Sequence, residues 1–297
     1  MKIVQSLWTK PVVESKNGLD RFNGGWLDKM YYYMSWALSC LKLKEFYGEV
    51  ELVTDRLGED ILINKLELPY SSVVVVLDTL NHYHSDLWAA GKLYAYSIQR
   101  SPFVHVDNDV FIWTGVLEKI VNKPLISQNL DCNHPSYIET ISEIENKDFY
   151  IPNTIKEERN NNLNLFASNA GVLGGTDVNF FKEYTRLAFD FINKNVSHLE
   201  RINVASLNII FEQYLFYCLA KEKNISVAYL FEQIEYGYTS PKSYVHFWKV
   251  PHRTDYIHVI SDFKKSRLIA EEMLVRLKIE YPYYFYKVKS LIQNFYL

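Results

Sequence analysis

The chain has 297 residues, of which 48% are hydrophobic and 23% are charged, a composition typical of a globular protein with ample apolar material for a core. The formal net charge of −3 argues against a nucleic-acid partner, because nucleic-acid binders need a basic surface. The longest apolar run, 215–220, is too short to span a bilayer, and Lys10 and Pro11 interrupt any signal-peptide core at the start. We therefore expect a cytoplasmic protein without a transmembrane segment.

Apolar periodicity predicts strands alternating with helices along the first half of the chain. Strands are expected at 2–6, 50–53, 72–77, 103–106 and 124–127. Helices are expected at 26–46, 58–66 and 88–99, with a loop over 7–25. The run 72–77 is apolar on both faces, as in a buried parallel strand. This alternation predicts an α/β fold with a mixed, mostly parallel sheet flanked by helices.

The domain organisation is expected to be simple. No linker rich in proline, glycine or serine and no repeat divides the chain, so we expect one domain over residues 1–265 and a helical C-terminal extension, 266–297, packed on it. Cys40, Cys132 and Cys218 are widely spaced and odd in number, which suits neither a disulfide framework nor a zinc site. They are expected to be small core residues in a reducing compartment.

The segment FVHVDNDVFIW, 103–113, places two carboxylates at the end of an apolar strand. In an extended segment, Asp107 and Asp109 point the same way, and ligands of open α/β sheets bind beyond the carboxyl ends of strands. Paired carboxylates suit a hard divalent cation such as Mg²⁺ or Mn²⁺, especially one shared with phosphate oxygens. The alternative is an Asx turn with both side chains in solvent.

A second segment, FASNAGVLGGT at 166–176, is a strand that breaks at Ser-Asn-Ala-Gly. Asn169 offers donor and acceptor groups suited to sugar hydroxyls. Gly171, Gly174 and Gly175 are expected to leave room for a ligand close to the backbone. The alternative is a tight turn between a strand and a helix.

A third segment, YIHVISDFKKS at 256–266, carries His258 in a short β-like run and, six residues later, Lys264. A neutral imidazole is a good third ligand for Mn²⁺, and a lysine can neutralise phosphate. Taken alone, such a histidine is more often a structural residue with its hydrogen bonds satisfied.

Together, the three segments resemble the glycosyltransferases of the GT-A fold, and among them the retaining family-8 type. That type has a strand ending in Asp-x-Asp, an "N-[SA]-G-V-L" strand and a late "H-x-x-G-x-x-K", and the order and coarse spacing agree from residue 2 to about 265. The resemblance implies a GT-A-like domain that transfers a sugar from a nucleoside-diphosphate sugar, with a UDP-sugar as the expected donor, to an unidentified acceptor hydroxyl. The beginning, "GGW…YMSWALSC…ELVTD", also resembles a bacterial family to which no function attaches.

The resemblance implies a role for each matching residue. Asp107, Asp109 and His258 would hold Mn²⁺ or Mg²⁺, and Asp107 would also lie near the ribose of the donor. The remaining donor-binding residues would be Ser6 and Trp8 for the nucleotide, Lys92 and Lys264 for the charged part of the donor, and Asn169 and Gly171 for the sugar.

Two positions depart from the family pattern. Ser261 replaces the glycine of the late motif, which bears on how closely that loop approaches the phosphates. Glu212 and Gln213 stand where the family has an Asp-Gln pair beneath the reacting carbon, in a register uncertain by one residue. They are the candidate catalytic residues, although a core helix with two polar positions needs no such function.

Three other interpretations remain open. In a haloacid-dehalogenase-type phosphatase, Asp107 would be the nucleophile and Asp109 the acid/base, but such enzymes usually carry this motif near the start. A protein that binds nucleotide sugars without turning them over is the second. Peripheral membrane contact is the third: residues 264–289 hold seven Lys/Arg against three Glu, around the aromatic cluster YPYYFY. A terminal helix pair packed on the core would explain that segment as well.

Overall fold

The computed structural model describes residues 1–14, 22–237 and 244–294. The chain divides into two compact units, each assembled from segments far apart in the sequence. Unit 1 comprises Met1, 86–105 and 119–240, and unit 2 comprises 2–85, 106–118 and 241–297. Both units combine strands with covering helices, so the predicted α/β class is confirmed. The single GT-A-like domain over 1–265 stays a prediction.

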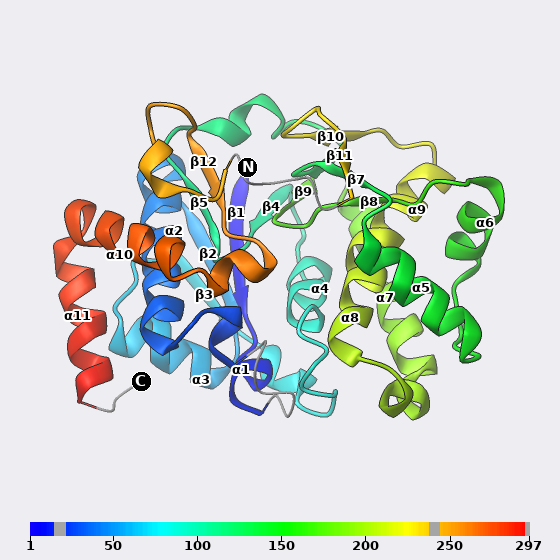
Figure 1. Cartoon of the computed structure of the whole chain (residues 1–297), viewed down its shortest axis with the longest axis horizontal. Coiled ribbons are helices and arrows are strands. Elements are labelled where there is room, and N and C mark those ends of the chain that lie inside the picture. Colours follow the sequence, from blue (N-terminus) through cyan, green and yellow to red (C-terminus); the bar gives the residue numbers. More distant parts are fainter. Residues whose placement is uncertain (15–21, 238–243, 295–297) are drawn as a thin grey trace. The chain divides into compact units, whose positions relative to one another are not determined.

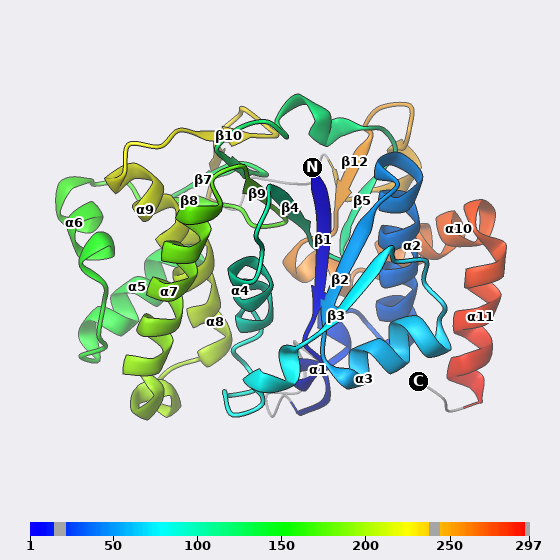
Figure 2. The ribbon, with the colours of Figure 1, turned by 180° about the vertical axis from the view of Figure 1, so that it is seen from behind.

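The principal strands of unit 2 are parallel and follow one another in space as they do in the chain (Figure 2). They are β1 (Lys2–Leu7), β2 (Val50–Thr54) and β3 (Ser72–Val75), with Ile3 opposite Val50 and Glu51 opposite Ser72. β1 and β2 are mostly buried, whereas β3 is only half-buried. The prediction that 72–77 is a fully buried strand is therefore wrong, because β-branched apolar composition also suits a half-covered strand.

Helix α2 (Lys29–Tyr47) connects β1 with β2 and is buried over most of its length. The Asp28 side chain caps it by accepting hydrogen bonds from the backbone N–H groups of Met30 and Tyr31, and Gly48, with φ 70°, ends it. At the C-terminus, α10 (Arg267–Glu280) and α11 (Pro282–Gln293) pack against α2 (Figure 1). Apolar side chains from these three helices belong to one core cluster, which explains why α2 shows no polar face.

The predicted loop at 7–25 contains more regular structure than expected. A short helix, α1 (Lys10–Glu14), and a 3-10 turn, η1 (Phe22–Gly25), lie within it, while 15–21 fall outside the described residues. Pro11 was interpreted as a loop residue, but proline is tolerated in the first turn of a helix, where no N–H partner is needed. The predicted helix at 58–66 is confirmed as α3 (Arg56–Glu59) followed by a π-helical stretch, η2 (Asp60–Lys65).

Unit 1 holds two small groups of strands. The first has the order β10-β6-β9-β4, with β9 antiparallel to β6, and the second has the order β11-β7-β8. Their bounds are β4 (Phe103–Val106), β6 (Leu125–Ser127), β7 (Leu130–Cys132), β8 (Phe166–Ser168), β9 (Val172–Gly175), β10 (Val227–Tyr229) and β11 (Glu235–Tyr236). The chain passes from unit 1 into unit 2 after His105, within the last residues of β4.

In the part of unit 1 that the structure describes, six α-helices accompany these strands. They are α4 (Ala90–Ser97), α5 (Pro135–Asn146), α6 (Asn153–Asn161), α7 (Val178–Lys194), α8 (Val204–Ile209) and α9 (Leu215–Glu222). The predicted helix at 88–99 is confirmed as α4, which packs against α7. Tyr96, Phe103, Phe181, Tyr184 and Phe216 form a buried aromatic cluster with edge-to-face and tilted ring pairs. All three cysteines of the chain are buried and free, as predicted.

Two glycines of the FASNAGVLGGT segment serve packing between backbones. A Cβ at Gly174 would lie 2.2 Å from the carbonyl oxygen of Phe103, and one at Gly175, where φ is 149°, would lie 2.0 Å from that of Pro124. The expectation that these glycines leave room for a ligand is therefore wrong, since neighbouring backbone already fills the space. A glycine in a strand signals close approach but does not say of what.

Candidate functional site

The Asp-Asn-Asp segment is a turn that α2 holds in place through side-chain hydrogen bonds. Within the turn, the Val110 N–H donates to the carbonyl oxygen of Asp107 at 3.1 Å. Ser39 donates to the carbonyl oxygen of Val110 at 2.7 Å, and the Asn108 amide donates to Ser35 at 3.1 Å. Ser35 and Ser39 lie one helical turn apart on α2, so the helix holds the turn at two points.

Further hydrogen bonds fix Ser39 itself in place. The Gln5 amide donates to Ser39 Oγ at 3.0 Å, and the Tyr70 hydroxyl donates to Gln5 Oε1 at 2.8 Å. Sequence reasoning missed these residues. The only signal was the pair of serines, one turn apart, in the otherwise apolar helix segment YMSWALSC.

A second pair of strands in unit 2 delivers His258 to this turn. β12 (Tyr256–His258) pairs antiparallel with β5 (Val110–Ile112), so that His258 lies opposite Val110 (Figure 1). The Val259 N–H donates to the carbonyl oxygen of Asp109 at 3.0 Å. Backbone pairing therefore brings the late histidine beside the two carboxylates, although they are far apart in sequence.

Asp107, Asp109 and His258 form a cluster that fits a divalent metal ion. Each offers one ligand atom, and these atoms lie within 4.8 Å of one another. Two ligands that share one ion about 2.1 Å away cannot be more than about 4.2 Å apart, so a small inward movement would complete the coordination. Asp109 Oδ1 is buried, lies 3.5 Å from His258 Nε2 and accepts no hydrogen bond from the described residues. A buried oxygen in that condition is suited to a cation, and two carboxylates with an imidazole suit Mn²⁺ or Mg²⁺.

Lys264 forms an ion pair with this cluster. Its Nζ lies 2.6 Å from Asp109 Oδ2 and donates to the carbonyl oxygen of Gly24 at 3.2 Å. Burial alone would raise the pKa of Asp109, but Lys264 and His258 hold it well below its usual range, so this carboxylate is ionised. Lys265 behaves differently: it is exposed and pairs with Asp262 at 3.2 Å. Contact of Lys264 with a diphosphate stays a prediction.

Ser261 adopts the conformation that glycine favours. Its φ is 52°, in the left-handed region that non-glycine residues rarely occupy, at the first position of the 3-10 turn η8 (Ser261–Lys265). This is the position at which the family-8 motif has glycine. Ser261 therefore has a backbone conformation for which glycine is the usual residue.

The effect of replacing Ser261 on the free energy of unfolding should depend on how well the new residue fits the left-handed region. Ser261→Gly should alter the free energy of unfolding by less than about 1 kcal/mol, because relief of left-handed strain offsets the added chain entropy. Ser261→Val should lower it by about 1–2 kcal/mol, because a β-branched residue fits this region poorly. Urea unfolding would measure both. Ser266→Val is the control, since Ser266 has φ −76° and makes no side-chain cap bond, and an equal loss there would contradict the explanation.

The candidate catalytic pair lies in unit 1, inside a π-helical turn. This turn, η6 (Ile210–Tyr214), interrupts the helix between α8 and α9 and contains Glu212 and Gln213. Glu212 is fully buried, and its Oε1 lies 2.6 Å from Lys92 Nζ. Lys92 also donates to the carbonyl oxygen of Ala170 at 3.2 Å. The lysine predicted as a donor-binding residue thus neutralises the buried glutamate, and π-turns of this kind are frequent at functional sites.

Gln213 continues the polar network toward β7. Its Oε1 accepts a 2.6 Å hydrogen bond from the Tyr137 hydroxyl, which also lies 3.2 Å from Asp131 Oδ2. Asp131 Oδ1 accepts from the Asn129 amide at 2.7 Å. Burial raises the pKa of Asp131 to about 6 despite these hydrogen bonds. Sequence reasoning missed Asn129, Asp131 and Tyr137. The polar alternation in SQNLDCN was a signal for the first two, and no pattern indicated Tyr137.

Asn169 and Gly171 form the tight turn between β8 and β9. Asn169 Oδ1 accepts from the Gly171 N–H at 3.0 Å, and the Asn169 carbonyl oxygen accepts from Ser127 Oγ at 2.7 Å. The Asn169 side chain also hydrogen-bonds Asp131, so the turn joins the same network. The structure therefore brings Lys92, Asn169, Glu212 and Gln213 into one region of unit 1. Their roles toward a sugar remain predictions.

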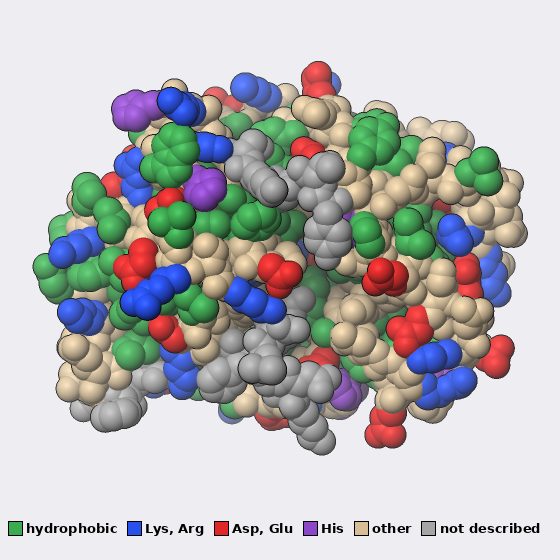
Figure 3. All heavy atoms as spheres, viewed as in Figure 1, with side chains coloured by type: hydrophobic (Ala, Val, Ile, Leu, Met, Phe, Trp, Pro, Cys, Tyr) green, Lys and Arg blue, Asp and Glu red, His purple; other side chains and the backbone are tan. Residues whose placement is uncertain are grey.

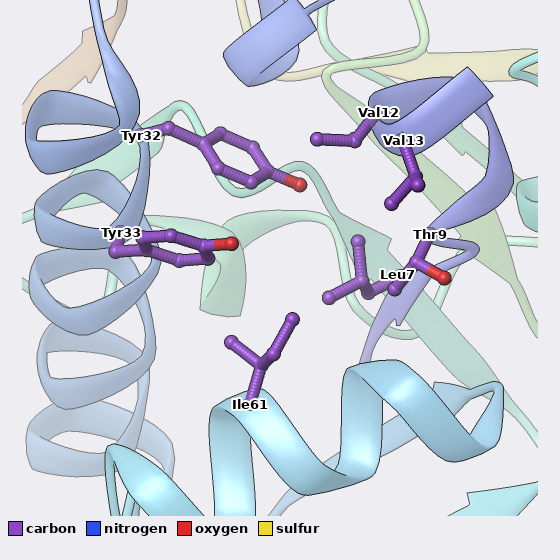
Figure 4. A pocket seen from close by; sticks show the side chains of 7 residues that line it. All are labelled: Leu7, Thr9, Val12, Val13, Tyr32, Tyr33 and Ile61. Carbon is purple, nitrogen blue, oxygen red and sulfur yellow. The ribbon is translucent and has the colours of Figure 1, made fainter. Parts of the chain in front are cut away.

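Ser6 and Trp8 lie at the end of β1 in unit 2. Ser6 is half-buried, while Trp8 is buried and donates from Nε1 to Asn81 Oδ1 at 3.1 Å. A small pocket adjoins this end of the strand (Figure 4), lined by Leu7, Thr9, Val12, Val13, Tyr32, Tyr33 and Ile61. Its volume of about 20 Å³ holds about one water molecule and is too small for a nucleobase as it stands.

The outward faces of the C-terminal helices carry apolar side chains interspersed with basic and acidic ones (Figure 3). Leu268 and Ile279 of α10 are 63% and 69% exposed, and Tyr283 of α11 is 59% exposed. The opposite faces of both helices pack on α2, so the terminal helix pair expected as one explanation of this segment is present. Membrane contact through the exposed faces stays a prediction. None of the helices within the described ranges is long and apolar enough to cross a membrane.

Comparison with known protein families gives a match over nearly the whole chain. The model of a family of unknown function, DUF6734, matches residues 1–291. No protein with a curated description matches the chain. Because the match covers nearly the whole sequence, the chain belongs to the DUF6734 family.

Proposed function

We propose that the protein is a metal-dependent glycosyltransferase that takes its sugar from a nucleoside-diphosphate sugar, with a UDP-sugar as the expected donor. The observation that carries the proposal is the convergence of Asp107, Asp109 and His258 within 4.8 Å, through pairing of β5 with β12. The position of Ser261 in the left-handed region adds support, since the late motif calls for glycine there.

Asp107, Asp109, His258 and Lys264 would handle the charged part of the donor. A bound Mn²⁺ or Mg²⁺ would neutralise the diphosphate as it leaves. Lys264, already beside Asp109, would add a second positive charge that stabilises the transition state more than the ground state. The acceptor is unidentified, and a cytoplasmic setting remains part of the proposal.

Other residues are assigned to the sugar and to the reacting carbon. Asn169 and Gly171 are assigned to the donor sugar by resemblance, and Gln213 to the reacting carbon. Glu212 is fully enclosed with Lys92, so it would act by holding Gln213 and Lys92 in place, whereas the half-buried Gln213 could reach a ligand. Glu212 is therefore not assigned as a general base. That agrees with retention of configuration, which needs no strong base.

The phosphatase alternative is disfavoured by the environment of Asp109. A general acid must carry a proton, but despite burial, Lys264 and His258 hold the pKa of Asp109 well below its usual range. Lys264 Nζ lies 2.6 Å from one oxygen of the carboxylate, and His258 Nε2 lies 3.5 Å from the other. Such an arrangement suits an electrostatic or metal-binding role.

A donor screen would test the proposal. Purified protein with MnCl₂ should release nucleoside diphosphate from at least one member of a panel of nucleotide sugars, and EDTA should abolish the release. p-Nitrophenyl phosphate should not be hydrolysed under the same conditions. Asp262→Asn is a matched control, because this exposed carboxylate near the cluster pairs only with Lys265 among the described residues, and the variant should keep full activity.

Three results would change the assignment. Phosphatase activity without donor hydrolysis would make Asp107 the nucleophile. Donor binding without turnover, across a broad acceptor panel, would indicate a binding protein. Full activity in EDTA would remove all three proposed metal ligands.

A further inference from the structure

The network around Tyr137 contains one hydroxyl hydrogen and two acceptors that compete for it. The Tyr137 hydroxyl lies 2.6 Å from Gln213 Oε1 and 3.2 Å from Asp131 Oδ2. A phenol donates one hydrogen bond, so it cannot serve both acceptors at once. In the arrangement observed, the shorter bond goes to Gln213. The contact with Asp131 is then a hydrogen bond only if the carboxyl group carries the proton and donates it to the phenolic oxygen.

Ionisation of Asp131 would change which of the two acceptors receives the Tyr137 hydrogen. The Tyr137 hydroxyl would then donate its hydrogen to the Asp131 carboxylate. Gln213 Oε1 would be left facing the phenolic oxygen with no hydrogen between them, which is unfavourable unless Gln213 presents its NH₂ group instead. The amide would then have to rotate, exchanging Nε2 for Oε1. At present Gln213 Nε2 faces Glu212 Oε2 at 3.5 Å, which is favourable, whereas a rotated amide would place two acceptors against each other.

We propose that Asp131 is a positioning residue whose proton, relayed through Tyr137, sets the orientation of the Gln213 side-chain amide. The network has two states, each with its own hydrogen-bond order: protonated Asp131 with the Gln213 carbonyl toward Tyr137, and ionised Asp131 with the amide rotated or released. Because Gln213 reaches a ligand only under the proposed function, the effect of this switch on sugar binding rests on that proposal. The coupling itself does not.

The surroundings of Asp131 favour a proton within the physiological range. Asp131 is buried on β7, which is the main cause of its raised pKa of about 6, and Glu235 on the neighbouring strand β11 acts in the same direction. Hydrogen bonds from Asn129 and Asn169 oppose this shift, and a hydrogen bond from Tyr137 to the ionised carboxylate would oppose it as well. Among the residues that the structure describes, Tyr229 on β10 and the Lys92–Glu212 pair are further titratable and charged groups around the network.

Nuclear magnetic resonance of the ligand-free protein would test the coupling without any donor. Protein labelled with ¹³C-aspartate and ¹⁵N-glutamine would be titrated from pH 5 to pH 8. We expect the Asp131 carboxyl carbon and the Gln213 side-chain NH₂ signals to shift with one common midpoint near pH 6. In Tyr137→Phe, Asp131 should still titrate while the Gln213 signals lose their pH dependence. In Asp131→Asn, which mimics the protonated state, the Gln213 signals should stay fixed across the range.

The exposed Asp190, which pairs with Lys194 at 2.8 Å, provides the control. Asp190→Asn should leave both titrations unchanged. The proposal is overturned if Gln213 does not follow Asp131 in the natural protein, or if it still titrates in Tyr137→Phe. Because no nucleotide sugar is added, failure here would leave the glycosyltransferase proposal standing, and a failed donor screen would leave this coupling standing.

Discussion

Replacing Asp109 with asparagine should abolish Mn²⁺ binding and Mn²⁺-dependent donor hydrolysis while the protein remains folded. The carboxylate supplies the negative charge that a hard cation needs, and a neutral amide oxygen is a weaker ligand. Loss of outer-shell groups alone typically lowers metal affinity 10–100-fold, so loss of a direct ligand should exceed about 100-fold. Calorimetric titration with MnCl₂ and far-ultraviolet circular dichroism would measure binding and folding separately.

Two lysines next to each other in sequence sharpen this experiment. Lys264 pairs with Asp109 at 2.6 Å, so its ammonium group competes with an incoming metal ion. Lys264→Ala should therefore bind Mn²⁺ more tightly and yet turn over donor more slowly, by about 100-fold if it stabilises the leaving diphosphate. Lys265 pairs with Asp262, and Lys265→Ala should change neither quantity. Unaltered Mn²⁺ binding in Asp109→Asn would show that the cluster is structural.

The pattern of neighbouring residues was enough to predict those parts of the site that lie within one short segment of the chain. The apolar run at 103–106 predicted β4 and placed Asp107 and Asp109 at a strand end, which the structure confirms. The β-like run around His258 was likewise recognised. These predictions succeed because strand formation and side-chain direction follow from residues near in sequence.

Contacts between distant segments were beyond such reasoning. Ser39 holds the Asp-Asn-Asp turn from α2, and Tyr137 links Asp131 to Gln213, yet no local pattern relates these residues. Gly174 illustrates the same limit, because local sequence indicates that something lies close to it but not what. Its sequence context indicated a close approach, but only the pairing of strands determines that the approaching group is the Phe103 backbone.

The Lys92–Glu212 pair offers the largest expected effect on stability. Glu212 is fully buried and Lys92 nearly so, at 2.6 Å from each other. Lys92→Met would leave a carboxylate in the interior without its counter-charge. Breaking a buried pair by removing one partner typically lowers the free energy of unfolding by about 3–5 kcal/mol. For a chain of this size we expect a fall in Tm of roughly 10 °C, measurable by thermal and urea unfolding.

The double variant Lys92→Met/Glu212→Gln should recover most of this loss, because no charge is then buried without a partner. The surface pair Lys194–Asp190, at 2.8 Å, is the matched control, and Lys194→Met should lower stability by less than about 1 kcal/mol. If Lys92 contacts the donor as proposed, the double variant should fold but remain inactive. A double variant as unstable as Lys92→Met would mean that packing of the lysine stem, and not the charge of Glu212, causes the loss.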